Sequence, residues 1–241
     1  TGGAKAYVAV GGGGEASLEL GGPAGGATGG GGKLKGSGKS KEGKSEGGTL
    51  WTLHLGEAAP PLRVGFEVPL VKRWATQMSW FGRGPHESYP DRYAGAALGR
   101  YQGSVAAQAF GYVRPQESGN KYETRWLALS DGEGRGLLVV ADGAPLSMAA
   151  HHHTLSDVDT LPGGTVPRTR HAADLPVRDL TSLTVDGAQA GVGGIDSWGS
   201  LPLAEHRLDP TRPYSWAFTL RPFAPSDSAP AALAARLRQK D

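Results

Sequence analysis

From about residue 50 to residue 220, apolar and polar residues alternate with a period of two, and short turn-forming stretches interrupt the pattern. Successive side chains on a strand point to opposite faces, so each alternating segment predicts a strand with one face in a core. The clearest segments are residues 51–55, 62–68, 122–128, 136–141, 180–185 and 214–220. Helical spacing appears near residues 156–161 and 231–238. Many strands with few helices predict an all-β chain that folds as a large antiparallel β-sandwich.

Length and composition exclude several classes of protein. A chain of 241 residues can bury a sizeable core, as one large β domain or two small ones. Its formal net charge of +2 is small and evenly spread, so no nucleic-acid partner is expected. The chain has no cysteine, which excludes disulfides and thiolate metal sites. No apolar run approaches the roughly 20 residues that span a bilayer, so no membrane partner is expected either.

The first residues of this sequence do not identify the compartment of the protein. Residues 1–20 lack the basic start and the apolar core of a signal peptide. The compartment is therefore undetermined, and the cytoplasm is favoured. Because the chain begins Thr-Gly-Gly without Met, we expect it to be a fragment or a processed piece of a longer protein.

The composition changes sharply near residue 49. Nineteen of the 39 glycines lie within the first 48 residues, together with a lysine cluster at positions 33–44. Such a stretch offers little apolar surface to a core, so residues 21–48 are expected to be disordered or poorly packed. Weak edge strands are predicted at residues 6–10 and 16–20. The predicted organisation is a Gly/Lys-rich segment at 1–48, a β-sandwich domain at 49–223 and a short helical tail at 224–241.

The densest motif of the chain is residues 80–92, which read Trp-Phe-Gly-Arg-Gly-Pro-His-Glu-Ser-Tyr-Pro-Asp-Arg. Residues 77–81 look like the end of a strand, and the two glycines that follow predict a turn with positive φ. The two prolines stiffen the loop after that turn. Its four charged residues are expected to form one structural network that holds the loop: Arg83, Glu87, Asp91 and Arg92.

This run closely resembles the W-x-G-x-G-P-x-E-x-Y-P-D-R signature of the C-terminal domain of glycoside hydrolase family 2 β-galactosidases. Three later segments resemble the same domain in the family's order: Q-E-S-G-N-K with T-R-W in 116–126, H with L-P and R-D in 171–179, and G-V-G-G-I-D-S-W in 191–198. The matches cover roughly residues 62 to 223. The resemblance implies that this domain has the galactose-mutarotase-like fold, a large β-sandwich known as a supersandwich.

No catalytic residue is assigned in this chain. Retaining glycosidases need two carboxylates about 5 Å apart, one as acid/base and one as nucleophile. In family 2 enzymes, the acid/base Glu directly follows an Asn, and both catalytic residues lie in a separate barrel domain. The chain has a single Asn, Asn120, and Lys121 follows it. The alternating strands and helices of a barrel are absent as well.

The main substrate-binding candidate is Trp198. It follows Gly193 and Gly194, which would let the backbone turn and present the indole on a loop tip. Indole faces stack on the C–H face of a pyranose ring, and the resemblance implies that the matching Trp serves as a substrate platform in the catalytic domain's pocket. On the residues alone, a core ring is an equally good interpretation, as we expect for Trp80 and Trp126.

The other site candidates are weaker. They lie in the four resembling segments, and they are Asp196, His171, Glu87, Arg83 and Asn120. His86, Glu87 and His171 could form the His and Glu pair with which mutarotases move a proton, but ion-pair or packing roles are favoured. The family usually has an acidic residue where this chain has Ile195, so any contact made by that carboxylate is missing.

Three consecutive histidines, at positions 151–153, suggest a metal site at first sight. Neighbouring side chains on a strand point to opposite faces, so three adjacent histidines rarely chelate one ion. A solvated or edge strand is the favoured interpretation, and no metal site is assigned to this chain. The resemblance implies that the full family 2 enzyme uses Mg²⁺ and Na⁺.

These observations predict the C-terminal domain of a β-galactosidase, which completes the substrate pocket of a catalytic barrel outside this chain. The expected partners are a β-galactoside or other carbohydrate and that barrel domain, in a parent enzyme that is a homo-oligomer. Two alternatives stay open: a free-standing carbohydrate-binding or mutarotase-like module, and a structural interaction domain whose sugar site has decayed. The sequence of the full gene would separate them.

Overall fold

The computed structural model describes residues 61–158 and 169–239 in full. Earlier in the chain it describes the backbone of four strands, which are β1 (Lys5–Val10), β2 (Gly14–Glu19), β3 (Lys35–Gly36) and β4 (Thr49–His54). The expectation that residues 21–48 are poorly packed lies outside the described residues, apart from the short β3. Strands β1 and β2 pair with each other, and β1 also pairs with β5.

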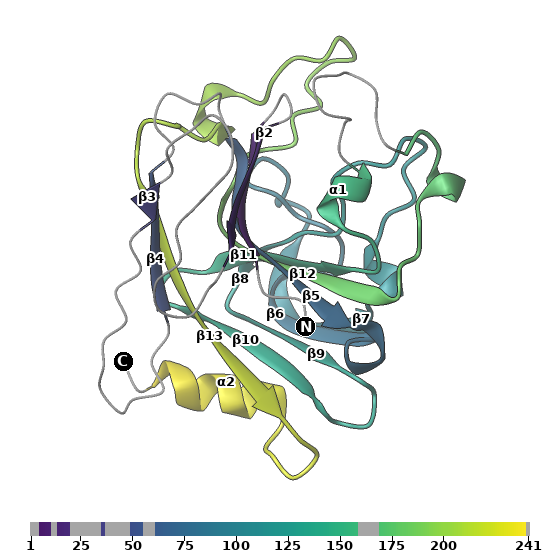
Figure 1. Ribbon diagram of the computed structural model, residues 1–241, viewed down its shortest axis with the longest axis vertical. Coiled ribbons are helices and arrows are strands. Elements are labelled where there is room, and N and C mark those ends of the chain that lie inside the picture. Colours follow the sequence, from purple (N-terminus) through teal and green to yellow (C-terminus); the bar gives the residue numbers. More distant parts are fainter. Residues whose placement is uncertain are drawn as a thin grey trace.

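The described strands form two antiparallel sheets (Figure 1). The six-stranded sheet has the order β2-β1-β5-β12-β11-β8, where β5 is Pro61–Val71, β12 Leu180–Gln189, β11 Leu146–His151 and β8 Lys121–Thr124. The seven-stranded sheet has the order β3-β4-β13-β10-β9-β6-β7, where β13 is Tyr214–Phe223, β10 Gly136–Asp142, β9 Trp126–Ser130, β6 Gln77–Gly84 and β7 Ala97–Ser104. The predicted all-β antiparallel sandwich is confirmed.

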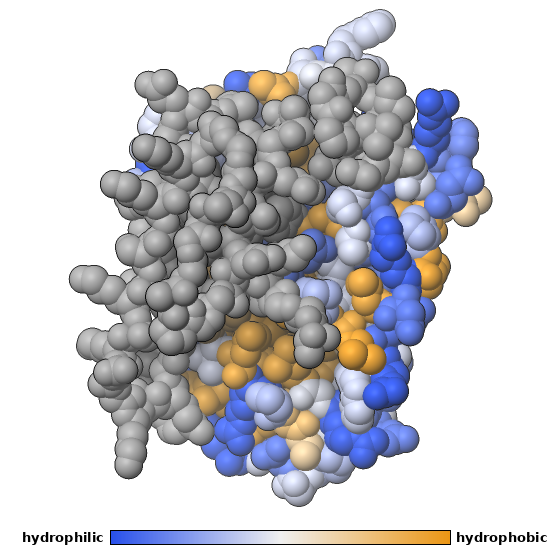
Figure 2. Space-filling model, in the orientation of Figure 1, coloured by the Kyte–Doolittle hydropathy of each residue, from blue (hydrophilic) through white to orange (hydrophobic). Residues whose placement is uncertain are grey.

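Helices are short among the described residues. The α-helices are α1 (Leu155–Val158) and α2 (Pro230–Arg238), and the 3-10 turns are η1 (Lys72–Trp74), η2 (Ala106–Gln108), η3 (Ala172–Asp174) and η4 (Ala204–His206). Figure 2 shows hydrophilic residues along the right-hand edge of the molecule, on the side where Figure 1 labels α1 and β7. None of the helices in the described part of the chain is long and apolar enough to cross a membrane.

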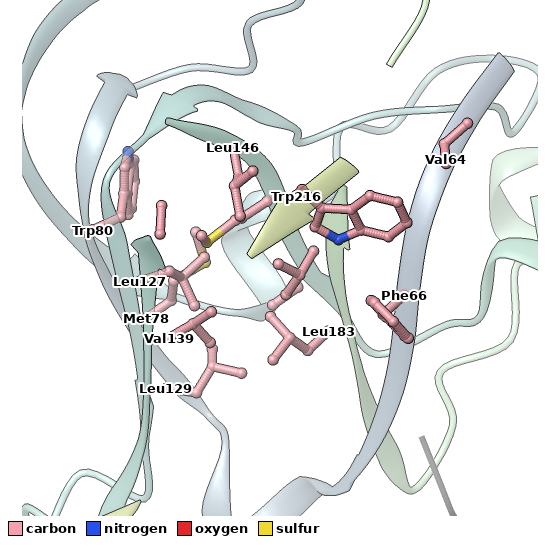
Figure 3. Close-up of a cluster of buried hydrophobic side chains, with 14 of the residues drawn as sticks. Val64, Phe66, Met78, Trp80, Leu127, Leu129, Val139, Leu146, Leu183 and Trp216 are labelled. Atoms are coloured by element: carbon pink, nitrogen blue, oxygen red, sulfur yellow. The ribbon is translucent and has the colours of Figure 1, made fainter. Parts of the chain in front are cut away.

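The main core lies between the sheets, where the inward-facing residues of both interdigitate (Figure 3). Trp80 and Leu127 come from the seven-stranded sheet, and Phe66 and Leu183 come from the six-stranded sheet. The Phe66 ring lies 5.6 Å from the Trp216 ring in a tilted arrangement. These contacts follow from the period-two alternation, because every second residue of each strand faces this layer.

A second, smaller core covers the other face of the seven-stranded sheet. Helix α2 buries Leu233 and Ala234 against a cluster formed by Trp126, Ala128, Leu138 and Val140. Pro230 occupies the first turn of the helix, where its missing N–H costs nothing. Trp80 and Trp126 are 1 % and 6 % exposed, so both are core rings, as expected.

The predicted strand at residues 122–128 is two strands, because the chain changes sheet at Arg125. Strand β8 lies at the edge of the six-stranded sheet, and β9 lies inside the seven-stranded sheet. Glu123 has a φ of 50°, in the left-handed region that favours glycine. The Arg125 N–H donates to the Phe81 carbonyl at 2.8 Å, which fixes the crossing.

The turn predicted at Gly82 and Gly84 was wrong, because β6 continues through both residues. Neither is among the glycines with positive φ in the described residues. Their small size serves close packing instead. A Cβ at Gly82 would lie 2.6 Å from Thr124 Oγ1 and 2.9 Å from Thr124 Cα, and one at Gly84 would lie 2.8 Å from the Tyr101 ring. Glycine here permits the approach of neighbouring strands.

The core assignment predicts a large effect of Trp80→Ala on stability. The Trp80 ring is fully buried and contacts Tyr101 and the Lys121 ammonium. We expect the free energy of unfolding, measured with urea, to fall by about 3–5 kcal/mol. Trp74→Ala is the matched control, because that ring is 41 % exposed and has the guanidinium groups of Arg73 and Arg135 over it. It should cost about 1 kcal/mol or less, and equal losses in the two variants would contradict the assignment.

Candidate functional site

The segment between β12 and β13 carries the main site candidate and runs across the top of the molecule in Figure 1. Gly193, Gly194 and Gly199 have φ values of 70°, 85° and 81°. Residues other than glycine rarely adopt such positive φ values. Between them, Trp198 is 92 % exposed. The indole is therefore on a loop surface and is not a core ring of this chain. Other exposed apolar residues of the segment are Val192, Ile195, Leu201 and Leu203.

Asp91 holds the start of this loop. Its Oδ1 accepts a hydrogen bond from the Val192 N–H at 3.0 Å, and its Oδ2 accepts one from the Gly193 N–H at 2.8 Å. Gly191 lets the two segments meet, because a Cβ there would lie 2.4 Å from Asp91 Oδ2. A carboxylate that accepts two backbone N–H groups makes strong, charge-assisted hydrogen bonds. The 80–92 motif thus positions the Trp198 loop.

Asp196 shapes the tip of the loop. Its Oδ1 accepts the Trp198 N–H at 2.9 Å and the Ser200 N–H at 3.2 Å, and its Oδ2 accepts the Ser200 hydroxyl. The Ser200 hydroxyl and these two amides lower the pKa of the Asp196 carboxyl. Both oxygens therefore stabilise the turn that presents the indole. The neighbouring Ile195 is 59 % exposed and adds apolar surface.

Glu87 is the centre of a compact hydrogen-bond cluster. Its Oε1 accepts from Arg92 Nη1 at 3.0 Å and from the Tyr112 hydroxyl, and its Oε2 accepts from the Gly119 N–H at 2.8 Å. The carboxylate is 7 % exposed. Among the described residues, no hydrogen bond or ion pair joins Glu87 to His86 or His171, so the structure gives no support to a His and Glu pair. His171 is exposed at the start of η3.

The expected single network of four charges was wrong in detail. Glu87 and Arg92 pair as expected, but Asp91 holds the Trp198 loop and Arg83 has separate partners. Arg83 Nε donates to Glu123 Oε2 at 2.8 Å, and its Nη1 donates to the Ala96 carbonyl at 3.1 Å. Its guanidinium also lies 4.6 Å above the Tyr93 ring. Arg83 therefore anchors the loop that follows β6.

Asn120 and Lys121 lie beneath this loop. The Asn120 side chain is fully buried, and its Nδ2 donates to the Ser88 carbonyl at 2.8 Å. The Ser88 N–H in turn donates to the Asn120 carbonyl. Lys121 Nζ donates to the Pro85 carbonyl at 3.3 Å and lies 4.8 Å above the Trp80 ring. Burial lowers the pKa of Lys121 to about 8. These side chains support the loop from inside.

The expectation of a solvated or edge strand at the three histidines was wrong. Strand β11 lies between β12 and β8, and His151 and His153 are 6 % and 8 % exposed. Their rings stack with centroids 4.7 Å apart, while His152 faces Thr181. Adjacent histidines do point to opposite sides, as expected, and residues 116–118 with Leu155 and Val158 of α1 lie next to His151 and His153. The described residues contain no group of three or more His, Asp or Glu that could hold a metal ion.

Sequence reasoning missed Asp91 as the residue that connects two motifs, and it missed Glu117 with Arg63. Arg63 donates to Glu117 Oε2 at 3.0 Å and to Asp186 Oδ2 at 2.5 Å. The signal for the second cluster was partly present, because Arg63 lies in the predicted strand 62–68 and Asp186 directly follows the predicted strand 180–185. Strand pairing, which places β12 beside β5, was needed to use it.

The fold and this surface define an all-β sandwich domain that presents an exposed aromatic loop. The chain belongs to the β-galactosidase small chain family, whose model matches residues 41–220. It is similar to the β-galactosidase of Priestia megaterium, with 37 % identity over 146 residues, or 60 % of this chain and 13 % of that protein.

Two further relatives give the same result. The β-galactosidase of Lactobacillus delbrueckii subsp. bulgaricus is 37 % identical over 158 residues, which is 66 % of this chain and 14 % of that protein. The β-galactosidase of Vibrio cholerae is 36 % identical over 164 residues, or 67 % of this chain and 14 % of that protein. The match to this chain spans about one seventh of the length of these relatives.

Removal of the Asp91 carboxylate should loosen the loop without unfolding the chain. In Asp91→Ala, we expect faster hydrogen–deuterium exchange of the Val192 and Gly193 amides, because both lose their acceptor. Asp227→Ala is the matched control, since Asp227 accepts the Ala224 N–H at 2.8 Å in a distant turn. Unchanged exchange at Gly193 in Asp91→Ala would contradict the assigned role.

The ion pair between Asp157 and Arg178, which lies in the motif segment 171–179, predicts a pH-dependent contribution to stability. The Asp157 carboxylate accepts from Arg178 Nε at 2.6 Å and from the Thr154 N–H at 2.8 Å. Burial alone would raise the pKa of Asp157, but Arg178 and Thr154 outweigh it and hold the pKa at about 2. A depressed pKa stabilises the fold above the unfolded value of about 3.9, and this contribution is lost as the pH falls through about 2.

Asp157→Asn should therefore lower the melting temperature at pH 7. The difference from the unmodified chain should shrink as the pH falls from about 4 to about 2, because both chains then lack the charge. A difference that stays constant across this range would show that the ionised carboxylate contributes nothing.

Proposed function

We propose that this chain is the C-terminal domain of a β-galactosidase and that it forms one wall of the substrate pocket in the parent enzyme. The single observation that carries this proposal is the exposure of Trp198. A ring that is 92 % exposed, on a loop with two carboxylates devoted to its shape, is a surface built for a partner. Membership of the β-galactosidase small chain family supports the same conclusion.

The indole would bind the sugar by stacking. A galactose ring presents a patch of C–H groups to an aromatic face, and the flat indole offers a large apolar area at low entropy cost. The exposed Val192, Ile195, Leu201 and Leu203 would contact the rim of the catalytic barrel. Ile195 suits this role, because an apolar side chain gains from being covered.

The carboxylates near this surface support the proposal that catalysis lies elsewhere in the parent. Both oxygens of Asp91 and of Asp196 accept hydrogen bonds from the loop, and Glu87 is held by Arg92 and Tyr112. A retaining pair needs two available carboxylates about 5 Å apart. The resemblance implies Mg²⁺ and Na⁺ in the full enzyme, and other parts of the parent would hold them; the described residues contain no group of three or more His, Asp or Glu that could hold a metal ion.

The chain by itself should not hydrolyse β-galactosides. Incubation of the purified chain with a chromogenic galactoside should give no turnover above the buffer rate, since no retaining pair can be assigned. Turnover that persists through repurification and is lost in a carboxylate variant of this chain would overturn the proposal that the chemistry belongs to the barrel.

In the full parent enzyme, Trp198→Ala should weaken substrate binding through lost stacking. The expected loss is about 1–3 kcal/mol in apparent affinity, and Trp198→Phe should recover part of it. Trp74→Ala, at another exposed indole, is the control and should leave KM unchanged. A Trp198→Ala enzyme with unchanged kinetics would favour the alternative of a structural interaction domain. The parent gene should also encode a barrel with an Asn-Glu pair upstream of this domain.

A further inference from the structure

A second exposed apolar surface lies on the 109–115 loop, in the segment that joins η2 to β8 without regular secondary structure. Phe110 is 62 % exposed and Val113 is 87 % exposed. The Phe110 ring also lies 4.5 Å from the Tyr112 ring in a tilted arrangement, so the apolar and aromatic side chains of this loop gather in one place. Single exposed apolar residues are common on proteins, whereas a cluster of them indicates an interaction surface.

Hydrogen bonds hold the 109–115 loop in a defined conformation. The Tyr112 hydroxyl donates to Glu87 Oε1, and it accepts from Arg92 Nη1 at 3.0 Å. The Tyr112 N–H donates to the Phe110 carbonyl at 2.9 Å, and Pro115 is buried. An apolar surface that is already fixed in place loses little conformational entropy when a partner covers it.

This loop and the Trp198 loop are attached to the same structure, the loop that follows β6. Glu87 holds Tyr112, and Asp91 holds the start of the Trp198 loop. Between these two carboxylates, the backbone of residues 89–92 closes on itself with hydrogen bonds of 3.0 and 2.9 Å. The two apolar surfaces therefore share one support, and a partner that covers one of them lies close to the other.

The length of the relatives identifies a partner large enough for this surface. The match to this chain covers 13–14 % of the β-galactosidase relatives, so most of each relative lies outside it. In the proposed function, the catalytic barrel of the parent lies against the Trp198 loop. A barrel in that position would also reach the 109–115 loop, because one support carries both loops.

The charges beside the loop indicate the chemistry of the facing surface. Arg114 is exposed and forms no ion pair among the residues that the structure describes. Arg92 is 58 % exposed, although it pairs with Glu87. Interfaces typically have an apolar centre and a polar rim of complementary charge. The facing surface is therefore expected to be apolar at its centre and acidic at its rim.

We propose that the 109–115 loop is a second contact between this chain and the catalytic barrel of the parent enzyme. Phe110 and Val113 pack into an apolar surface of the barrel, while Arg92 and Arg114 face acidic side chains at its rim. This inference rests on the proposed function for the identity of the partner, but it does not depend on sugar stacking at Trp198.

Labelling of an introduced cysteine tests this contact, because the 241-residue chain has no cysteine of its own. Val113→Cys should react with a water-soluble maleimide at least about tenfold more slowly in the full parent enzyme than in the 241-residue chain, since a covered thiol reacts only when the contact opens. Mass spectrometry of the labelled peptide gives the rate. Val177→Cys is the matched control: Val177 is 76 % exposed in the segment before β12, and this variant should react equally fast in both proteins.

Three labelling results would overturn the proposal. Equal rates for Val113→Cys in the two proteins would show that nothing covers the loop in the parent. Equal slowing of Val113→Cys and Val177→Cys would show that the cover is not specific to this loop. Slow labelling in the 241-residue chain that recovers on dilution would assign the surface to a second copy of the chain instead of the barrel.

A charged substitution gives an independent test. Val113→Asp should leave the melting temperature of the 241-residue chain unchanged, because the side chain is exposed there. In the parent it should raise the rate of irreversible heat unfolding about tenfold, because it places an unpaired carboxylate in the contact. Val177→Asp should leave both proteins unchanged, and a parent that tolerates Val113→Asp equally well would contradict the contact.

The failure of this inference and the failure of the proposed function give different results. If Trp198→Ala leaves substrate binding unchanged while Val113→Cys is protected in the parent, the substrate platform is wrong and the contact stands. If Trp198→Ala weakens binding while Val113→Cys reacts freely in the parent, the platform stands and the contact is wrong.

Discussion

The carboxylate of Asp91 connects the two segments that form the functional surface. It accepts the N–H groups of Val192 and Gly193, which lie 101 and 102 positions further along the chain. One segment follows β6 of the seven-stranded sheet and the other follows β12 of the six-stranded sheet. The sandwich brings the two loops together, and the charge-assisted hydrogen bonds then fix their geometry. Because of this clamp, the loop that presents Trp198 has a defined start although its tip is exposed.

Most polar residues of the four motif segments are used for structure. Glu87, Arg83 and Asn120 look like ligands for a substrate when they are read as a list of functional groups. In the folded chain Glu87 binds Arg92, Arg83 binds Glu123, and the Asn120 amide nitrogen binds the Ser88 carbonyl, although Asn120 Oδ1 has no hydrogen-bond partner. A buried polar group without a partner is costly, so a dense polar motif tends to satisfy itself. What remains for recognition is the apolar face of one indole, which suits a sugar ring.

The six-stranded sheet departs from the usual alternation of an apolar inner face and a solvated outer face. Thr184 and Asp186 lie on its outer side and are buried, and the stacked His151 and His153 complete the same surface. Polar groups on a solvated face would form hydrogen bonds with water. On this buried face they must find partners within the protein, because a buried polar group without a hydrogen bond is destabilising. Two acceptors on this face, His151 Nδ1 and Asp186 Oδ1, are buried without a hydrogen-bond partner among the described residues.

The sequence by itself determined the fold class, because period-two alternation and turn spacing are local properties that survive any arrangement of strands. It also determined that Trp198 follows a glycine pair that allows the backbone to turn, and both Gly193 and Gly194 have positive φ. It did not determine β7 or β11, whose small and polar residues carry little alternation. The roles of Gly82, Asp91 and His151 were decided by tertiary structure, since each depends on a residue at least 30 positions away. Local patterns report which face of a strand is apolar, whereas only strand order decides what covers the other face.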